Sequence, residues 1–201
     1  MIAIIDYGMG NLRSVQKACE YVGYDARITA DKQTIRDASH VILPGVGAAR
    51  DALQNLRERG LFDEAIRAAE SGKPFLGICL GMQLLFDRSL ENGEHECLGL
   101  VPGEVVPFRV NGLRVPHMGW NSLQIRNNPL FSREESETYV YFVHSYHAQG
   151  VEEGDIIATC EYGYPFTAAV RRGNVFGTQF HPEKSGDTGI AMIKNFGGLR
   201  L

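Results

Sequence analysis

The stretch KPFLGICLGMQLLF, residues 73–86, decides the fold of this chain. Residues 73–76 are typical of the start of a buried strand, and the apolar residues from 80 onward predict a helix. Between them lies Gly-x-Cys-x-Gly at 77–81, the cysteine version of a nucleophile elbow. Its two glycines permit a sharp turn that a Cβ would obstruct. The sulfur of Cys79 is therefore expected at the carboxyl end of a strand and at a helix N-terminus, where the helix dipole favours the thiolate.

Gln83 lies four residues after Cys79, so the predicted helix places both residues on one face. Taken alone, the segment has a competing interpretation as a small buried cysteine in a glycine-rich turn, because free cysteine is often a core residue. The elbow therefore needs a second motif before it predicts catalysis.

A second motif near the C-terminus, GTQFHPEKS at 177–185, supplies that support. The residues before it are typical of a strand, and Pro182 is expected to keep the chain extended. In extended chain His181 and Glu183 face the same side, so the carboxylate can orient the imidazole. Both motifs stand where a predicted strand ends, which is where ligands bind in open α/β sheets. Together they predict a catalytic triad of Cys79, His181 and Glu183.

Length and composition narrow the class of protein. A chain of 201 residues that is 44% hydrophobic is long enough for one domain with a sizeable core, so we expect a single domain over 1–201. The net charge of −4 argues against nucleic acid as a partner. Residues 1–6 lack the basic start and long apolar core of a signal peptide, and no run approaches the roughly 18 apolar residues that span a membrane. A cytoplasmic protein with no membrane association is expected.

The cysteine and histidine spacings predict neither a metal site nor a bound cofactor. The four cysteines, at 19, 79, 97 and 160, show no paired spacing, and the six histidines are dispersed. Gly8-Met9-Gly10 follows the first predicted strand, but Arg13 occupies the place of the third glycine in a dinucleotide-binding fingerprint. We therefore expect that loop to pack at the rim of the active site or at a partner surface.

The order of the predicted elements indicates an α/β fold. Up to residue 100, β-rich runs alternate with helical patterns, which predicts a mainly parallel sheet flanked by helices. The runs expected as strands are 2–6, 24–29, 41–43 and 73–76, and those expected as helices are 11–22, 49–58 and 61–71. After residue 100 the pattern changes to strands with short turns, more antiparallel in style. Those expected strands are 104–110, 121–125, 138–144, 156–162, 166–171 and 174–180, before a closing helix at 188–196.

The motifs together predict acyl transfer from an amide. A thiolate that attacks an amide creates an oxyanion, which needs hydrogen-bond donors. The backbone N–H of Leu80, directly after the nucleophile, is one expected donor. The loop PGVG at 44–47 is a candidate for the second, because its glycines let the backbone approach closely; a plain strand-ending turn is the alternative. His181 would deprotonate Cys79 and later protonate the leaving amine, and water would clear the thioester.

These residues carry a family resemblance. GICLGMQ together with FHPE is similar to the class I glutamine amidotransferases. Four further segments narrow the resemblance: IDYGMGNL at 5–12, PGVG at 44–47, PHMGWN at 116–121 and YFVHSY at 141–146. Together they resemble the glutaminase subunits of imidazole glycerol phosphate synthase, over nearly the whole chain.

The resemblance implies a flavodoxin-like or Rossmann-like fold and the hydrolysis of L-glutamine to L-glutamate and ammonia. It also implies a heterodimer with a cyclase subunit, a (β/α)₈ barrel. That subunit would use the ammonia to make imidazole glycerol phosphate and aminoimidazole-carboxamide ribonucleotide in histidine biosynthesis. The implied oxyanion hole is formed by Gly47 and Leu80. The implied glutamine-binding residues are Gly47, Gln83, His144 and Ser145. The implied partner-facing residues are Asn11, Trp120, Tyr141 and Lys184. By itself, each of these residues also has an ordinary structural interpretation, such as a solvated charge for Lys184.

Three competing interpretations come from different functional classes. One is a glutaminase that feeds another synthase, such as one for pyridoxal phosphate or anthranilate, and the segment PHMGWN argues against it. Another is a cysteine peptidase or chaperone-like protein of related architecture, and the segment HPE argues against it. The last is a binding module with a decayed site, and the intact triad argues against it. A partner is also expected on chemical grounds, because ammonia released into water at neutral pH becomes ammonium, which is not a nucleophile.

Overall fold

The computed structural model describes residues 1–131 and 138–200, and its centre is a parallel sheet. The strand order at the centre is β2–β1–β3–β4–β13, and each neighbouring pair is parallel. These strands are β1 (Ile2–Ile5), β2 (Ala26–Thr29), β3 (His40–Gly45), β4 (Phe75–Cys79) and β13 (Val175–Thr178). All residues of β1, β3, β4 and β13 are buried, as expected for parallel strands that are covered on both faces.

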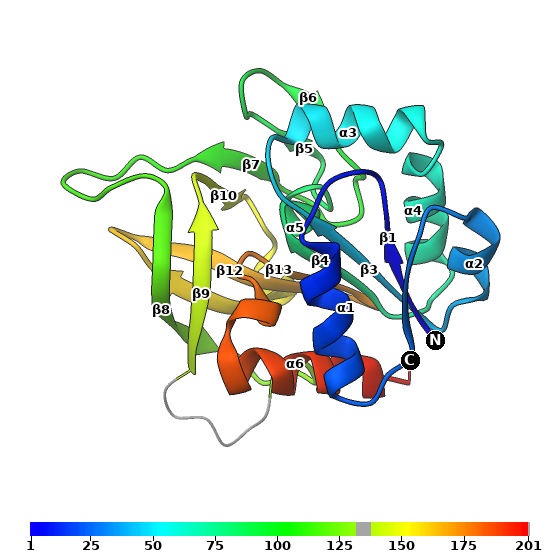
Figure 1. The fold of residues 1–201 in the computed structure, drawn as a ribbon. Coiled ribbons are helices and arrows are strands. Elements are labelled where there is room, and N and C mark those ends of the chain that lie inside the picture. The colour runs from blue at the N-terminus through cyan, green and yellow to red at the C-terminus, as the bar shows by residue number, and fades with distance from the viewer. Residues whose placement is uncertain (132–137, 201) are drawn as a thin grey trace.

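Helices cover both faces of this sheet (Figure 1). One face is packed by α1 (Leu12–Tyr21) and α6 (Gly186–Gly198), and the other by α2 (Lys32–Asp37), α3 (Ala49–Glu58) and α4 (Phe62–Glu70). Alternation along β1 separates the two cores: Ile4 packs with Val15 of α1, whereas Ile5 packs with Leu53 of α3. The predicted layered α/β arrangement is confirmed.

The C-terminal half adds antiparallel strands to this sheet, as predicted. Beyond β13 the order continues through β12, β10 and β7, with each neighbouring pair antiparallel. The short strands β5 and β6, which precede residue 100, close this edge, and β5 pairs with β7 in parallel. The strand β11 joins β12 to the hairpin of β8 and β9. Their bounds are β5 (Arg88–Ser89), β6 (His95–Glu96), β7 (Glu104–Pro107), β8 (His117–Ile125), β9 (Thr138–His144), β10 (Tyr146–Gln149), β11 (Ile156–Glu161) and β12 (Pro165–Arg172). Figure 1 shows the β8–β9 hairpin standing at one side, across from the helices α3 and α4.

Several elements differ from the sequence-based expectation. The elements α2, β5, β6 and β10 were not predicted, because runs of two to six residues show too little periodicity. The strand β8 begins at His117 rather than at residue 121, because pairing of His117 with His144 extends it through a Gly-containing segment that resembles a turn. The helix after the elbow, α5 (Leu80–Gln83), is a single turn and does not continue to residue 86.

The parallel strands bring the two sequence motifs to one edge of the sheet. The register pairs Gly45 of β3 with Cys79 of β4, and Ile78 of β4 with Thr178 of β13. The PGVG loop, the elbow and the segment containing His181 therefore all leave the sheet at the carboxyl ends of adjacent strands. The described residues also include the 3₁₀ turns η1 (Glu153–Asp155) and η2 (Pro182–Lys184). Within the described residues, no helix has the length and apolar character needed to cross a bilayer.

Candidate active site

The elbow holds Cys79 in a backbone conformation that few side-chain-bearing residues adopt. Cys79 has φ +55° and ψ −110° at the junction of β4 and α5. A side-chain-bearing residue in this strained backbone conformation destabilises the fold by about 1–3 kcal/mol. Tight packing enforces the turn: a Cβ at Gly77 would lie 2.6 Å from the Gly81 carbonyl oxygen, and a Cβ at Gly81 would collide with the carbonyl oxygen of Leu43. Gly77 is therefore required by the tight turn of the elbow itself, and Gly81 by its contact with β3.

His181 and Glu183 form the predicted pair, but the chain between them is not extended. The Nδ1–H of His181 donates to Oε1 of Glu183 at 2.8 Å, and the two side chains are 2% and 1% exposed. His181 itself is extended, whereas Pro182 begins the 3₁₀ turn η2. The expectation of an extended segment was wrong because the φ that proline imposes also suits the first position of a helical turn. The carboxylate nevertheless reaches the imidazole and fixes its tautomer.

The environment of His181 favours its charged form. Burial opposes the charge, but the neighbouring Cys79 and Glu183 outweigh burial and raise the pKa of His181 to about 9. Nε2 of His181 is buried and makes no hydrogen bond of standard geometry with a described residue. Cys79 nevertheless lies near enough to interact with the imidazole, an arrangement that suits a Cys–His pair.

Buried hydrogen bonds tie the backbone of His181 to β9. The N–H of His181 donates to the Tyr141 carbonyl at 3.0 Å, and the N–H of Tyr141 donates to Oγ of Ser185 at 3.0 Å. The Ser185 hydroxyl in turn donates to the His181 carbonyl at 2.6 Å. Sequence reasoning missed Ser185, since a serine after the triad acid carries no signal by itself. It fixes the loop that carries His181 and Glu183 against the hairpin.

A hollow of about 440 Å³ opens beside Cys79 and His181. A volume of this order suits a small-molecule substrate. Its lining includes all four residues that the resemblance implies for glutamine, namely Gly47, Gln83, His144 and Ser145. Leu80, Glu91 and Tyr146 also line it. Segments from both halves of the chain thus converge on Cys79.

Two buried glutamines connect to the sulfur of Cys79. Nε2 of Gln83 donates to the Tyr146 carbonyl at 3.1 Å and to Oε1 of Gln179 at 3.0 Å. Nε2 of Gln179 in turn lies 3.9 Å from Sγ of Cys79, at the outer limit for a hydrogen bond to sulfur. Sequence reasoning missed Gln179, although its position two residues before His181 on a strand-like segment was an available signal.

The PGVG loop is held by the first loop of the chain, 7–10. The Tyr7 hydroxyl donates to the Pro44 carbonyl at 2.9 Å, and burial together with nearby Cys79 raises the pKa of Tyr7 above its usual range. A Cβ at Gly45 would lie 2.6 Å from the Tyr7 oxygen, whereas Gly47, with φ +88°, meets only the end of the Met9 side chain. The expectation that 7–10 packs at the rim of the site is confirmed, and the conformational freedom of PGVG lies at Gly47 rather than at Gly45.

A carboxylate that the sequence did not single out also lines the hollow. Oε2 of Glu91 accepts from the N–H of Ala49, the first residue of α3, at 2.7 Å. This bond joins the substrate side of the hollow to the helix that follows PGVG. Glu91 stands in an unpatterned stretch, so no sequence signal pointed to it.

Three of the four residues implied to face a partner gather on the outer face of the hairpin. Trp120 is 57% exposed and stacks edge-to-face on Tyr141 at 6.1 Å, and Nζ of Lys184 lies 6.0 Å from the Tyr141 ring. Met118, also exposed, extends this apolar face along β8. Asn11 precedes α1, a helix that contacts η2. Exposed aromatic clusters of this kind mark interaction surfaces.

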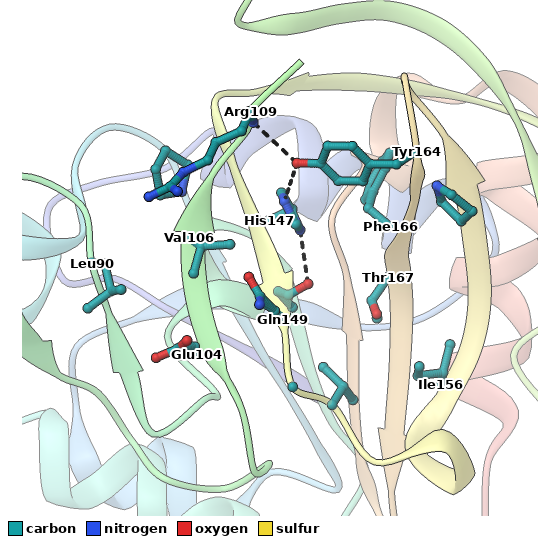
Figure 2. A pocket seen from close by; sticks show the side chains of 15 residues that line it. Leu90, Glu104, Val106, Arg109, His147, Gln149, Ile156, Tyr164, Phe166 and Thr167 are labelled. Carbon is teal, nitrogen blue, oxygen red and sulfur yellow. Dashed lines mark hydrogen bonds between the residues drawn. The ribbon is translucent and has the colours of Figure 1, made fainter. Parts of the chain in front are cut away.

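A larger hollow of about 730 Å³ lies elsewhere, among β7, β10 and β12 (Figure 2). Neither Cys79 nor His181 lines it. At its centre Nε2 of His147 accepts from the Tyr164 hydroxyl at 2.8 Å, and its Nδ1–H donates to the Ala148 carbonyl at 3.0 Å. The larger hollow therefore contains a satisfied polar cluster without a nucleophile. Nowhere in 1–131 or 138–200 do three or more His, Cys, Asp or Glu residues form a group suited to a metal ion.

Comparison with known families agrees with this geometry. The model of the family described as "Glutamine amidotransferase class-I" matches residues 3–197, and the chain belongs to this family. Among solved structures, "Crystal structure of glutamine amidotransferase" aligns with a TM-score of 0.76 at 21% identity, covering 98% of this chain and 100% of that one. "Structure of PurLQS from Thermotoga maritima" gives 0.74 at 22% identity, covering 97% and 96%. At such identities these likenesses show the shared fold alone.

Closer relatives specify the branch of the family. A protein of Geobacter sulfurreducens is 50% identical over 99% of both chains, and one of Caldanaerobacter subterraneus is 52% identical over 99% of this chain and 98% of its own. Both are named "Imidazole glycerol phosphate synthase subunit HisH". Within the class-I amidotransferases, the chain belongs to the HisH family.

Proposed function

We propose that this chain is the glutaminase subunit of an imidazole glycerol phosphate synthase. It hydrolyses L-glutamine and passes the ammonia to a cyclase subunit, a (β/α)₈ barrel, with which it forms a heterodimer. The observation that carries the proposal is the meeting of Cys79, His181 and Glu183 beside a hollow of glutamine size, in a chain about 50% identical to HisH subunits. The single domain over 1–201, the cytoplasmic location and the absence of a cofactor remain predictions from the sequence.

The proposed reaction assigns one task to each triad member. The Cys79 thiolate attacks the side-chain amide carbon of glutamine, and the imidazolium of His181 protonates the leaving amine to release ammonia. Neutral His181 then takes a proton from water, which hydrolyses the γ-glutamyl thioester to glutamate. Glu183 keeps Nδ1 of His181 protonated, so that Nε2 faces the reaction. The backbone N–H groups of Leu80 and Gly47 are the proposed oxyanion donors.

The lining of the hollow suggests how the other end of glutamine is held. The Glu91 carboxylate suits the α-ammonium group, because an acid at the pocket wall pairs with a cation. Gln83 uses both amide hydrogens on protein acceptors, which leaves its oxygen as the group offered to the substrate. Ser145 offers a hydroxyl. Both ring nitrogens of His144 are bonded to protein atoms, so His144 would contribute its backbone or ring edge.

The proposed docking surface for the cyclase is the outer face of the β8–β9 hairpin with its neighbours. Trp120, Tyr141 and Lys184 form its exposed centre, and Asn11 lies at the start of α1. Aromatic residues with a nearby cation are typical of interface centres.

The variant Cys79→Ala tests the division of labour. In complex with the cyclase, it should lose glutamine-dependent synthesis and retain synthesis driven by an ammonium salt at raised pH, because the acceptor site lies on the other chain. The assay follows imidazole glycerol phosphate formation with each nitrogen donor, with complex assembly checked by gel filtration. Loss of the ammonium-driven reaction in an assembled complex would refute the proposal.

A further inference from the structure

A chain of hydrogen bonds, partly buried at Asn121 and buried between the two histidines, runs from β8 to Cys79. We propose that Asn121, His117 and His144, here called the amide–histidine chain, are positioning residues for glutamine hydrolysis. Through them, docking on β8 would act on the glutamine hollow. The inference rests on the proposed function and deepens it, because it names the route by which a partner regulates the same site.

In the amide–histidine chain, the hydrogen-bond donors and acceptors have one consistent order. Nδ1–H of His144 must donate to the Tyr146 carbonyl at 2.8 Å, because a carbonyl only accepts. Nε2 of neutral His144 is then an acceptor, and it receives Nδ1–H of His117 at 3.0 Å. Nε2 of His117 accepts in its turn from Nδ2 of Asn121 at 3.3 Å. The second hydrogen of that amide donates to the Glu161 carbonyl at 2.9 Å.

This direction requires both rings to be neutral, and their burial ensures it. Burial lowers the pKa of His117 to about 4. Burial is also the main cause that lowers the pKa of His144 to about 3, and nearby His117, His147 and His181 add to the effect. Ring orientation is fixed as well, since His117 is stacked between Phe142 at 4.6 Å and Tyr162 at 4.0 Å.

Further hydrogen bonds continue from the amide–histidine chain to the sulfur of Cys79. The Tyr146 carbonyl accepts from His144 and also from Nε2 of Gln83, so one peptide oxygen joins the two parts. Gln83 then donates to Gln179, whose amide lies against Sγ of Cys79. A shift of His144 would therefore move a peptide at the wall of the hollow together with the two glutamines behind the nucleophile.

The amide–histidine chain starts on β8, the strand that carries Trp120 of the proposed docking surface. Along β8, His117 and Asn121 point inward, while Met118 and Trp120 are 61% and 57% exposed. A partner that displaces these two exposed side chains would also shift the β8 backbone, which carries the inward side chains of Asn121 and His117. Buried hydrogen-bonded groups tolerate such shifts poorly, because an unsatisfied group is costly.

The test replaces His117 and uses His147 as its matched control. His117→Phe keeps a ring between Phe142 and Tyr162 but removes the donor to His144. His147→Phe removes an equally buried, doubly bonded imidazole from the same aromatic cluster, where Phe108 contacts both histidines, but breaks no bond of the chain. Figure 2 shows His147 bonded to Tyr164 in the larger hollow, which Cys79 does not line. Glutamate release is measured with the free protein and with the cyclase complex, together with Tm and the affinity for the cyclase.

For His117→Phe in the complex, kcat should fall about tenfold, the order expected for one lost buried hydrogen bond. We call the kcat of the complex divided by the kcat of the free protein the activation ratio, and if docking acts through the amide–histidine chain this ratio should fall as well. Affinity for the cyclase should stay within about twofold, because the outer face is unchanged. His117→Asn, whose amide can still donate to His144, should recover part of the rate. His147→Phe should lower Tm to a similar extent and leave kcat and the activation ratio as in the wild type.

The inference is overturned if His117→Phe keeps the wild-type activation ratio, if His147→Phe loses as much activity, or if His117→Asn is no more active than His117→Phe. Should His117→Phe fail to fold, Asn121→Ala breaks the first bond at a half-buried position and must lower the activation ratio in the same direction. A wild-type complex without glutamate release would refute the proposed function itself. If the wild-type complex releases glutamate and the variants keep the wild-type activation ratio, only the proposed role of the amide–histidine chain is refuted.

Discussion

Glu183→Gln removes one charge from the centre of the site and keeps the shape of the side chain. In the wild type, Oε1 of Glu183 accepts from Nδ1–H of His181 at 2.8 Å, and neither side chain is more than 2% exposed. The glutamine amide either accepts through its oxygen, which keeps the tautomer, or donates through its nitrogen, which reverses it. In both cases the imidazolium loses its charged partner.

Two limits bound the expected loss of rate. A buried hydrogen bond to a charged group contributes about 1.5–3 kcal/mol, which corresponds to a fall in kcat of about 10- to 150-fold if the tautomer survives. A reversed tautomer raises the loss toward about 10⁴-fold. The pKa of His181 must also fall from its value of about 9, because Glu183 is one of the two groups that raise it.

The assay measures glutamate release in the cyclase complex, with the titration of His181 followed by NMR. Glu64→Gln is the matched control, because Glu64 is also 1% exposed and paired with Arg36 but lies away from the hollow. It should reduce stability and leave kcat unchanged. A Glu183→Gln variant with near-wild-type kcat and an unchanged pKa of His181 would refute the assignment of Glu183 as the orienting acid.

Three further predictions concern docking, folding and pH. Trp120→Ala should weaken cyclase binding by about 2 kcal/mol, or roughly 30-fold by titration calorimetry, without lowering Tm, whereas Tyr21→Ala, at a residue 80% exposed on the far end of α1, should change neither. Gly81→Ala should prevent formation of the elbow, seen as loss of both activity and cooperative thermal unfolding; a stable, active variant would contradict the packing argument. Because burial depresses the pKa of His117 and His144, the unfolded chain binds protons that the folded chain does not as pH falls below about 6.5, so stability should fall from there toward pH 4. Denaturant titrations across that range should show a shallower fall for His117→Phe, and an equal slope would argue against the buried neutral state.

The parts of the site that rest on short, local patterns could be predicted from the sequence. Gly77 and Gly81 around Cys79 predict a strand-to-helix turn, and apolar runs such as Val41–Ile42–Leu43 predict buried parallel strands. Because parallel strands end at the same edge, the meeting of the elbow with His181 followed from the fold class.

The remaining features depend on the registers of distant strands, which no local pattern encodes. His117 meets His144 only because β8 pairs with β9 in one particular register, and Gln179 reaches Cys79 only across two strands. Glu91 lies in a stretch without periodicity. The 3₁₀ turn at Pro182 was missed because the φ of proline fits both extended and helical chain.

In the proposed reaction, Cys79 alone performs the nucleophilic attack on glutamine. The most direct measurement is labelling of the cyclase complex with a glutamine-analogue electrophile, followed by peptide mass spectrometry and a glutaminase assay. All four cysteines are buried, and burial is the main cause that raises the pKa of Cys19, Cys97 and Cys160 to about 12, so these three should stay unlabelled. We predict one label per chain, on Cys79, with loss of glutaminase activity in proportion. Loss of activity with the label on another cysteine and Cys79 unmodified would contradict the account.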